Sequence, residues 1–363
     1  MRIAVIGGGH GCYAAAADLS ERGHEVRLWR RAAAELEPLR ARGAITLKDA
    51  RGERAVPLAA ITADLGAALD GAALVLMPLP ATAQAEMARA LAPHLRDGQV
   101  VFVPPGTFGS VVIADLVRAA GNGAELAYAE AGTLPYLARK HAPDAIAITV
   151  RATRLPTGVF PAAASARAFP VLEAAYPAIE RLTDALDAAL MNAGPIIHPP
   201  LVLMNAGPLQ ALPRWDIHRE GTGPATRAVT DALDGERIAV REALGYRPPH
   251  FPLANHYARE GEEWMYGRAA HDRLTDSGDW RESIDLARHR YVREDVAEGL
   301  AFLVSVAEWA GVACPVARGL LAIGSAMLGE NLRACGRTLE RLGLAGLSRA
   351  QMRRRLGHAE TTA

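Results

Sequence analysis

The first thirty residues constrain the fold of this chain more than any other segment. The apolar run Ile3–Ile6 leads into the glycine-rich turn Gly7–Gly11, a stretch of small residues follows, and a second apolar run spans Glu25–Trp29. Strand, glycine turn, helix and strand in this order form the first βαβ unit of a dinucleotide-binding domain. The segment therefore predicts a parallel sheet with a pyrophosphate site where the first helix starts.

We expect the turn to bind a dinucleotide cofactor through Gly7, Gly9, His10 and Gly11. Gly7 permits the tight turn after the strand, and Gly9 lets the backbone approach the phosphates without a Cβ in the way. Unpaired N–H groups and the positive end of the helix dipole attract the anion. Cys12 replaces the third glycine of the usual G-x-G-x-x-G pattern. The alternative interpretation is a turn that uses glycine for geometry alone.

The end of the second strand favours NADP(H) over NAD(H) as the cofactor. In NAD sites an acidic residue at this point binds the ribose 2′-hydroxyl. Here Arg30 and Arg31 follow the strand instead. An arginine pairs well with a 2′-phosphate. The alternative is an NAD site that lacks its acid, with two solvated arginines beside it.

Two further apolar runs, Ala73–Met77 and Val100–Val103, have the composition of buried parallel strands. Ligands of an open parallel sheet gather at the carboxyl ends of its strands. We therefore expect Pro78, Pro80 and Gly106, which follow these runs, to line the cofactor crevice.

Other strands of the first half are predicted from shorter patterns. Ile45–Lys48 and Arg54–Leu58 flank a turn signature and predict a hairpin. Leu126–Glu130 and Ala145–Val150 are expected to continue the parallel sheet.

From about Phe169 the pattern becomes helical, with helices expected over Arg237–Leu244, Asp295–Trp309 and Val316–Leu328. The predicted fold is an α/β Rossmann-like N-terminal domain over residues 1–188, followed by an all-helical C-terminal domain over residues 189–363.

Composition excludes several classes of protein. The chain has 40 basic and 40 acidic residues, whereas nucleic-acid-binding proteins normally carry a basic surplus. Its three scattered cysteines offer neither a disulfide framework nor the spacing of a metal site. The apolar stretch 299–328 is interrupted by charged residues, which argues against a membrane span. Because Met1 leads straight into a core strand, we expect no signal peptide and a cytoplasmic protein.

Hydride transfer needs a group that manages the accompanying proton, and histidine titrates in the useful range. Among 11 histidines, His198 stands out because it lies at the expected domain junction and two prolines follow it. A catalytic imidazole needs an orienting carboxylate, for which we choose Asp295. Arg290 is suited to bind a substrate carboxylate, and Asn205 is a further candidate for binding substrate or cofactor. The alternatives are a loop histidine for His198 and helix caps for Asp295 and Asn205.

At these residues the whole chain resembles the octopine/nopaline (opine) dehydrogenase family. The similarity covers the glycine turn, the second strand, Pro104-Pro-Gly106 and Glu130-Ala-Gly-Thr-Leu-Pro135. It also covers Asn192-x-x-Pro195-x-x-His198-Pro199, Asn205-Ala-Gly207, Arg290-Tyr-x-x-Glu-Asp295-Val and Gly311-Val-Ala-Cys-Pro315.

The resemblance implies a reversible NAD(P)H-dependent reaction in which an amino acid and a 2-oxo acid form an imine that is then reduced. It implies that His198 is the acid/base, that Asp295 holds its other ring nitrogen and that Arg290 binds a substrate carboxylate. His10 and Cys12 depart from the family turn, which often has Asn and Gly at these positions.

Two other functions remain open. A ketopantoate or 3-hydroxyacid-type reductase shares the domain order but resembles a pattern with a catalytic lysine. The chain has only Lys48 and Lys140, neither of them in the expected helical domain. The other alternative is a dinucleotide-binding sensor without catalysis, since a fold does not fix an activity. The apolar helices leave a homodimer open.

Overall fold

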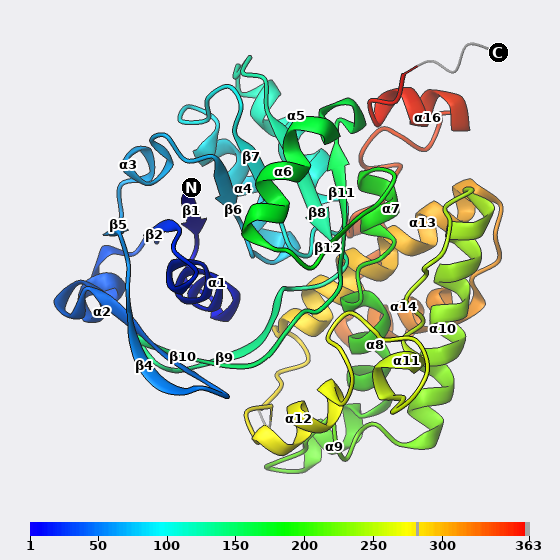
Figure 1. Ribbon diagram of the computed structural model, residues 1–363. Helices are drawn as coiled ribbons and strands as arrows, with labels where there is room; N and C mark the ends of the chain where they lie inside the picture. The colour runs from blue at the N-terminus through cyan, green and yellow to red at the C-terminus, as the bar shows by residue number, and fades with distance from the viewer. Residues whose placement is uncertain (281–282, 360–363) are drawn as a thin grey trace. The chain divides into compact units, whose positions relative to one another are not determined.

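The computed structural model describes residues 1–280 and 283–359 and divides into two compact units (Figure 1). The N-terminal unit contains Met1–Leu79, Ala83–Ala189 and the terminal segment from Leu356. The C-terminal unit contains Pro80–Thr82 and Leu190–Arg355. The expected boundary between residues 188 and 189 differs from this division in three places. Residues 80–82 belong to the C-terminal unit, and Ala189 and the segment from Leu356 belong to the N-terminal unit.

An eight-stranded sheet forms the core of the N-terminal unit, in the order β12-β11-β8-β7-β6-β1-β2-β5. Neighbouring strands are parallel except β11, which runs antiparallel to β8. The strands β1, β6 and β7 are almost wholly buried, as their continuous apolar runs indicate. The bounds are β1 Arg2–Ile6, β2 Glu25–Trp29, β5 Ala60–Thr62, β6 Leu74–Leu76, β7 Val100–Val103, β8 Ala127–Ala131, β11 Leu155–Phe160 and β12 Ile179–Arg181. The parallel sheet and its first βαβ unit are confirmed.

Helices connect these strands, and the most important of them is α1 (His10–Glu21), between β1 and β2. Its small residues Ala14–Ala17 are fully or almost fully buried, which allows close packing. The other helices of this part of the chain are η1 Ala33–Leu36, α2 Glu37–Arg42, α3 Leu65–Leu69, α4 Ala81–Leu91, α5 Gly109–Ala119, η2 Ala162–Ala164, α6 Ser165–Ala175 and α7 Ala185–Ala189.

A second, four-stranded sheet, in the order β4-β3-β10-β9, is the main feature that the sequence analysis missed. The hairpin β3 (Ala44–Asp49) and β4 (Gly52–Pro57) forms as predicted. However, β10 (Ala145–Arg151) was expected in the parallel sheet and instead pairs with β3 and with β9 (Tyr136–Ala142). The expectation for residues 145–150 was wrong because an apolar strand pattern does not specify its partner.

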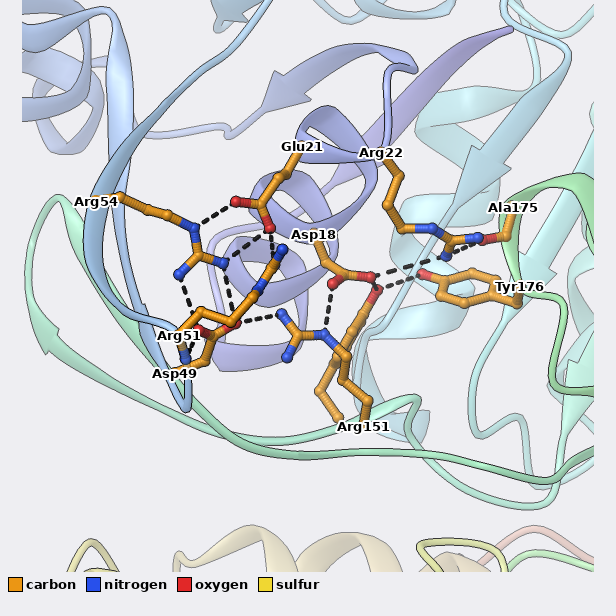
Figure 2. Close-up of polar contacts among 10 residues, drawn as sticks. Asp18, Glu21, Arg22, Asp49, Arg51, Arg54, Arg151, Ala175 and Tyr176 are labelled. Carbon is orange, nitrogen blue, oxygen red and sulfur yellow. Dashed lines mark hydrogen bonds and ion pairs between the residues drawn. The ribbon is translucent and has the colours of Figure 1, made fainter.

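Ion pairs fasten this second sheet to α1 (Figure 2). Asp49, at the end of β3, accepts hydrogen bonds from Arg54 Nη1 at 2.8 Å and Arg151 Nη2 at 2.8 Å. Arg54 also donates to Glu21 on α1, and Arg151 Nε donates to Asp18 on α1 at 2.6 Å. The hydrogen bonds from Arg54 and Arg151 hold the pKa of Asp49 well below its usual range. The sheet and the helix therefore form one charged network of alternating sign.

The C-terminal unit is helical, with α10 (Pro224–Ala243) as its longest helix. Its remaining helices are α8 Gly194–Met204, α9 Ala206–Ala211, α11 Ala254–Tyr257, α12 Ala270–Ser277, η3 Tyr291–Leu300, α13 Ala301–Ala310, α14 Pro315–Leu328, α15 Leu332–Cys335 and α16 Arg349–Arg355. The element η3 is a π-helix that continues directly into α13. Within residues 1–280 and 283–359, no helix combines the length and hydropathy needed to cross a bilayer.

We expect Asp49→Asn to lower the free energy of unfolding by about 2 kcal/mol, because a buried charge network loses its central carboxylate. Its side chain is only 2% exposed. The pKa of Asp49 is depressed in the folded protein. The difference in unfolding free energy between wild type and variant should therefore be largest above about pH 5 and shrink as the pH falls below about 4. Urea unfolding at several pH values measures this.

The matched control is Asp144→Asn, whose partner Arg42 is 49% exposed. An exposed pair should contribute less than about 1 kcal/mol. Equal losses in the two variants would contradict a special role of Asp49.

Candidate active site

The glycine turn of the N-terminal unit has the geometry of a phosphate site. Gly7 follows β1 with a φ of 124°, which favours glycine, and its N–H donates to Trp29 O at 2.9 Å. Gly9 is the N-cap of α1 and has no side-chain cap. A Cβ at Gly9 would meet nothing within 4 Å. The start of the helix is thus open for an anion, as a dinucleotide site requires.

Cys12 occupies the position of the third glycine and packs inside the turn. Its buried Sγ lies 3.6 Å from Ile6 O and 3.7 Å from Pro78 O. Burial raises the pKa of Cys12 to about 12, so the group stays an uncharged thiol. The neighbouring Gly11 provides the close approach, since a Cβ there would lie 2.9 Å from Leu134 Cδ1 and 3.2 Å from Pro78 Cβ. Pro78 therefore borders the turn, and its contact with a cofactor stays a prediction.

Arg30, at the end of β2, lies over the turn. A Cβ on Gly8 would come within 2.6 Å of Arg30 Nε. Arg30 lines a cavity of about 510 Å³ together with Lys140, His141 and Glu35. Arg30 forms an ion pair with Glu35 from η1. The sequence has no carboxylate directly after β2, but Glu35, five residues after Arg30, lies close enough to pair with it.

Two other expected cofactor residues contact protein groups. His10 Nδ1 accepts a hydrogen bond from the backbone N–H of Lys140 at 2.8 Å, which joins α1 to β9. Arg31 forms an exposed ion pair with Glu86 at 2.7 Å. Pro80 counts with the C-terminal unit, so its role in cofactor binding stays a prediction.

The loop after β7 is held by a buried carboxylate. Glu130 is fully buried and accepts hydrogen bonds from Phe108 N at 2.7 Å and from the Ser110 hydroxyl. A Cβ on Gly106 would lie 2.1 Å from Glu130 Oε2, so this position admits only glycine. Thr107 and Phe108 have φ values of 54° and 64°, and such strain clusters at ligand sites.

In the C-terminal unit, His198 and Asp295 meet although they are far apart in the sequence. His198 Nδ1 lies 2.7 Å from Asp295 Oδ2. His198 is on α8 and Asp295 on the π-helix η3. The helix containing Asp295 begins at Tyr291, so a helix cap is excluded, and His198 is not a loop residue. We call this pair the His198–Asp295 dyad.

Close packing of α8 and η3 fixes the dyad. The ring of Tyr291 stacks on His198 with 3.8 Å between centroids and 17° between planes. A Cβ on Gly194 would lie 2.3 Å from Asp295 Oδ1, and one on Gly299 would lie 2.2 Å from Pro195 Cγ. Two glycines therefore let the helices approach closely enough for the imidazole and carboxylate to meet.

Two consecutive carboxylates of η3 are buried. Burial raises the pKa of Asp295 to about 7, and Arg290 opposes this shift. Burial also raises the pKa of Glu294 to about 7, and the neighbouring Asp295 adds to this. Glu294 Oε1 accepts from the N–H of Ala81 at 2.9 Å, whose carbonyl accepts from Arg337 Nη2 at 3.3 Å. The two carboxylates thus have different tasks, since Glu294 binds backbone and Asp295 orients an imidazole.

Comparisons with known proteins find opine dehydrogenases among the relatives and among the solved structures. Residues 181–328 match the family model described as NAD/NADP octopine/nopaline dehydrogenase, alpha-helical domain. Residues 2–104 match the NAD-dependent glycerol-3-phosphate dehydrogenase N-terminus. The opine dehydrogenase of Arthrobacter sp. (strain 1C) is 25% identical over 361 residues, which cover 96% of this chain and 97% of the relative.

Solved structures have the same fold. Octopine dehydrogenase in complex with NADH and agmatine matches with a TM-score of 0.69 at 19% identity, over 95% of this chain and 98% of that one. Yersinopine dehydrogenase with NADP+ bound matches with a TM-score of 0.63 at 16% identity, over 98% of each chain.

This chain is similar to the octopine/nopaline (opine) dehydrogenase family, through its helical domain and over nearly the whole length of one curated relative. The present chain is an NAD(P)-dependent oxidoreductase. Its two-part architecture, with a Rossmann-like and a helical unit, is the one expected from the sequence.

The two residues of this chain that were expected to bind substrate, Arg290 and Asn205, have different surroundings. Arg290 precedes η3, its side chain is 51% exposed, and its guanidinium lies 4.9 Å from the ring centroid of Tyr291. Asn205 is buried and donates to Leu201 O at 2.8 Å and Gly221 O at 3.1 Å. Its Oδ1 accepts from Trp215 Nε1 at 3.0 Å. These bonds favour a structural role for Asn205, and substrate binding by it stays a prediction.

Several functional candidates escaped the sequence analysis. Tyr291 was given no role of its own, although its place beside Arg290 in the family motif was a usable signal. Gly194, Glu35 and Lys140 gave no local signal, because their importance comes from contacts between segments distant in the chain.

We expect Gly194→Ala to lower kcat by about 10²-fold, because the new Cβ must displace the Asp295 carboxylate and so misplace His198. Steady-state kinetics measures the loss, and thermal unfolding checks that the fold survives. Gly235→Ala in α10 is the control, since a Cβ there meets nothing within 4 Å. Undiminished turnover of Gly194→Ala would show that dyad geometry does not depend on this contact.

Proposed function

We propose that this protein condenses the amine of an amino acid with a 2-oxo acid and reduces the resulting imine with NAD(P)H, preferring NADPH. The observation that carries the proposal is the 2.7 Å contact of His198 Nδ1 with Asp295 Oδ2, in a chain whose N-terminus has an open glycine turn. The product is a secondary-amine dicarboxylate, and the reaction is reversible.

The overall chemistry balances in two steps. Amine and 2-oxo acid lose one water to form the imine, and the imine then takes up a hydride and a proton. A dinucleotide bound at the glycine turn supplies the hydride. The glycine turn fits a dinucleotide, because Gly9 leaves the start of α1 open to a phosphate and Arg30 adds a positive charge beside the turn.

His198 is the proton-transfer group of the proposal. With Nδ1 bound to Asp295, the ring presents Nε2 for exchange of a proton with the substrate nitrogen or oxygen. Asp295 fixes the tautomer and stabilises the imidazolium. Arg290, whose guanidinium lies over the ring of Tyr291, binds a substrate carboxylate.

A matrix of amino acids and 2-oxo acids, assayed by oxidation of NADPH and NADH, tests the proposal. We expect oxidation only when both an amine and an oxo acid are present, with a secondary amine as product by mass spectrometry. Oxidation by an oxo acid alone would instead favour the ketopantoate-type reductase. Cofactor binding without turnover on any pair would favour a sensor.

We expect Asp295→Asn to lower kcat by roughly 10²–10⁴-fold, because an amide that donates to Nδ1 selects the wrong tautomer. NADPH affinity, measured by fluorescence titration, should stay within about twofold because the glycine turn lies in the other unit. Full turnover in this variant would make the dyad assignment wrong.

The pH dependence of opine oxidation gives a further prediction. This direction needs an ionised Asp295 and a neutral His198, and the pKa of Asp295 is raised to about 7. We therefore expect kcat/KM to rise tenfold per pH unit below about pH 7 and to level off above about pH 8. A rate that stays constant between pH 6 and pH 9 would contradict this.

We also propose that the protein works in a reducing, cytoplasmic environment, with small molecules as its partners and no nucleic acid. Cys12 and Cys314 are buried thiols. A homodimer through the apolar helices is a further proposal, for which Ile323 and Met327 of α14 offer exposed apolar side chains. Light scattering during gel filtration decides between monomer and dimer.

A further inference from the structure

We propose that Lys140, carried by β9 of the four-stranded sheet, joins Arg30 in binding the 2′-phosphate of NADPH and sets the preference of this chain for the phosphorylated cofactor. This inference deepens the proposed function and rests on the NADPH preference stated there. It assigns a cofactor role to a residue outside the βαβ unit.

The position of Lys140 beside the glycine turn is the first argument. Its Nζ lies 3.5 Å from Gly8 O, and its backbone N–H donates to His10 Nδ1 at 2.8 Å. Both partners belong to the turn or to the first residue of α1. In a dinucleotide fold the adenine ribose lies between this turn and the end of the second strand. Lys140 therefore reaches the region in which a 2′-phosphate would lie.

The cavity itself is the second argument. Lys140 and Arg30 line the same space of about 510 Å³, from two different sheets. His141 adds a third basic side chain, and Glu35 is the carboxylate that lines it. Since Glu35 pairs with Arg30, the ammonium group of Lys140 supplies the remaining positive charge. A dianionic phosphate would complement this set better than a neutral hydroxyl.

The surroundings of Lys140 are the third argument. The lysine is half-buried, and its Nζ lies 3.6 Å from the centroid of the Tyr13 ring. Among residues 1–280 and 283–359, no ion pair joins Lys140 to a carboxylate. Glu35, which lines the same cavity, pairs with Arg30, and Asp144 pairs with Arg42 at 3.1 Å. A cation held partly out of water without an acid is suited to an anionic ligand.

The charges that face Lys140 also make its own charge sensitive to pH. Burial, with Arg30 nearby, lowers the pKa of Lys140 to about 8. Of the groups on α1, Cys12 stays a thiol because burial raises its pKa to about 12, and burial also raises the pKa of Tyr13. His10 faces the backbone of Lys140, and His141 lies next in β9. Lys140 should thus lose its charge as the pH rises through about 8.

Ligand binding without turnover tests the proposal. The probes are adenosine 2′,5′-bisphosphate and adenosine 5′-monophosphate, compared by calorimetry on the full-length protein at pH 7. We expect the bisphosphate to bind at least tenfold more tightly. In Lys140→Gln this ratio should fall by about 10–100-fold, the value of one or two charge-assisted hydrogen bonds. A Lys140→Gln variant that keeps the wild-type ratio would overturn the proposal.

The chain offers a matched control. Lys48 is its only other lysine, lies exposed on β3 of the same sheet and pairs in register with Ala147 of β10. Lys48→Gln should leave the ratio unchanged, and an equal loss there would show a general charge effect instead. Glu35→Gln should raise bisphosphate affinity, because Arg30 loses its competing carboxylate; a fall would contradict the charge argument.

Lys140→Arg keeps the test decisive if Lys140→Gln fails to fold. Arginine stays charged at all accessible pH values. We expect the wild-type ratio to fall about tenfold between pH 7 and pH 9.5, and the ratio of Lys140→Arg to stay constant. The same pH dependence in both proteins would overturn the assignment. If the wild type bound both probes equally, the NADPH preference would fall, while an amine-dependent reaction with NADH would leave the imine-reducing activity standing.

Discussion

The charged network around Asp49 is the interaction on which the cofactor end of the molecule depends. Arg54 and Arg151 each bind a carboxylate of the four-stranded sheet and one of α1 (Figure 2). Helix α1 begins at the glycine turn, and these ion pairs join it to the four-stranded sheet. The network consequently fixes β9, the strand that carries Lys140, relative to the phosphate-binding turn.

The dyad of the C-terminal unit depends on a different principle, the absence of side chains. Gly194 and Gly299 let α8 and η3 pack closely, and the proximity brings an imidazole and a carboxylate together. Tyr291 then restricts rotation of the His198 ring by stacking on it. The cost of this arrangement is a carboxylate removed from water, which is why its pKa is raised.

Much of this architecture can be predicted from the sequence, because its signals are local. The glycine turn, the buried strands and the hairpin each occupy a few consecutive residues with a clear pattern. His198 was singled out by its place at the expected domain junction and paired with Asp295, and the family motifs implied the same pair, but no local pattern connects residues that are 97 positions apart.

Other features escaped prediction for physical reasons. Strand β10 has an apolar pattern that suits either sheet, and only its pairing with β3 decides between them. A loop histidine was the alternative interpretation of His198, but the residue lies on α8, and Pro199 and Pro200 lie inside the same helix, where tertiary packing prevails. Glu35 and Lys140 reach the cofactor end through the fold alone.

The π-helical turns of η3 make the dyad sensitive to the exact length of the chain. Each π-turn closes over one more residue than an α-turn. In this helix the consecutive side chains Glu294 and Asp295 bind the backbone of Ala81 and the ring of His198. Deletion of one residue of η3 before Asp295 would rotate its carboxylate around the helix axis and away from His198. The spacing between Tyr291 and Asp295 is therefore as much a part of the site as the two side chains of the dyad.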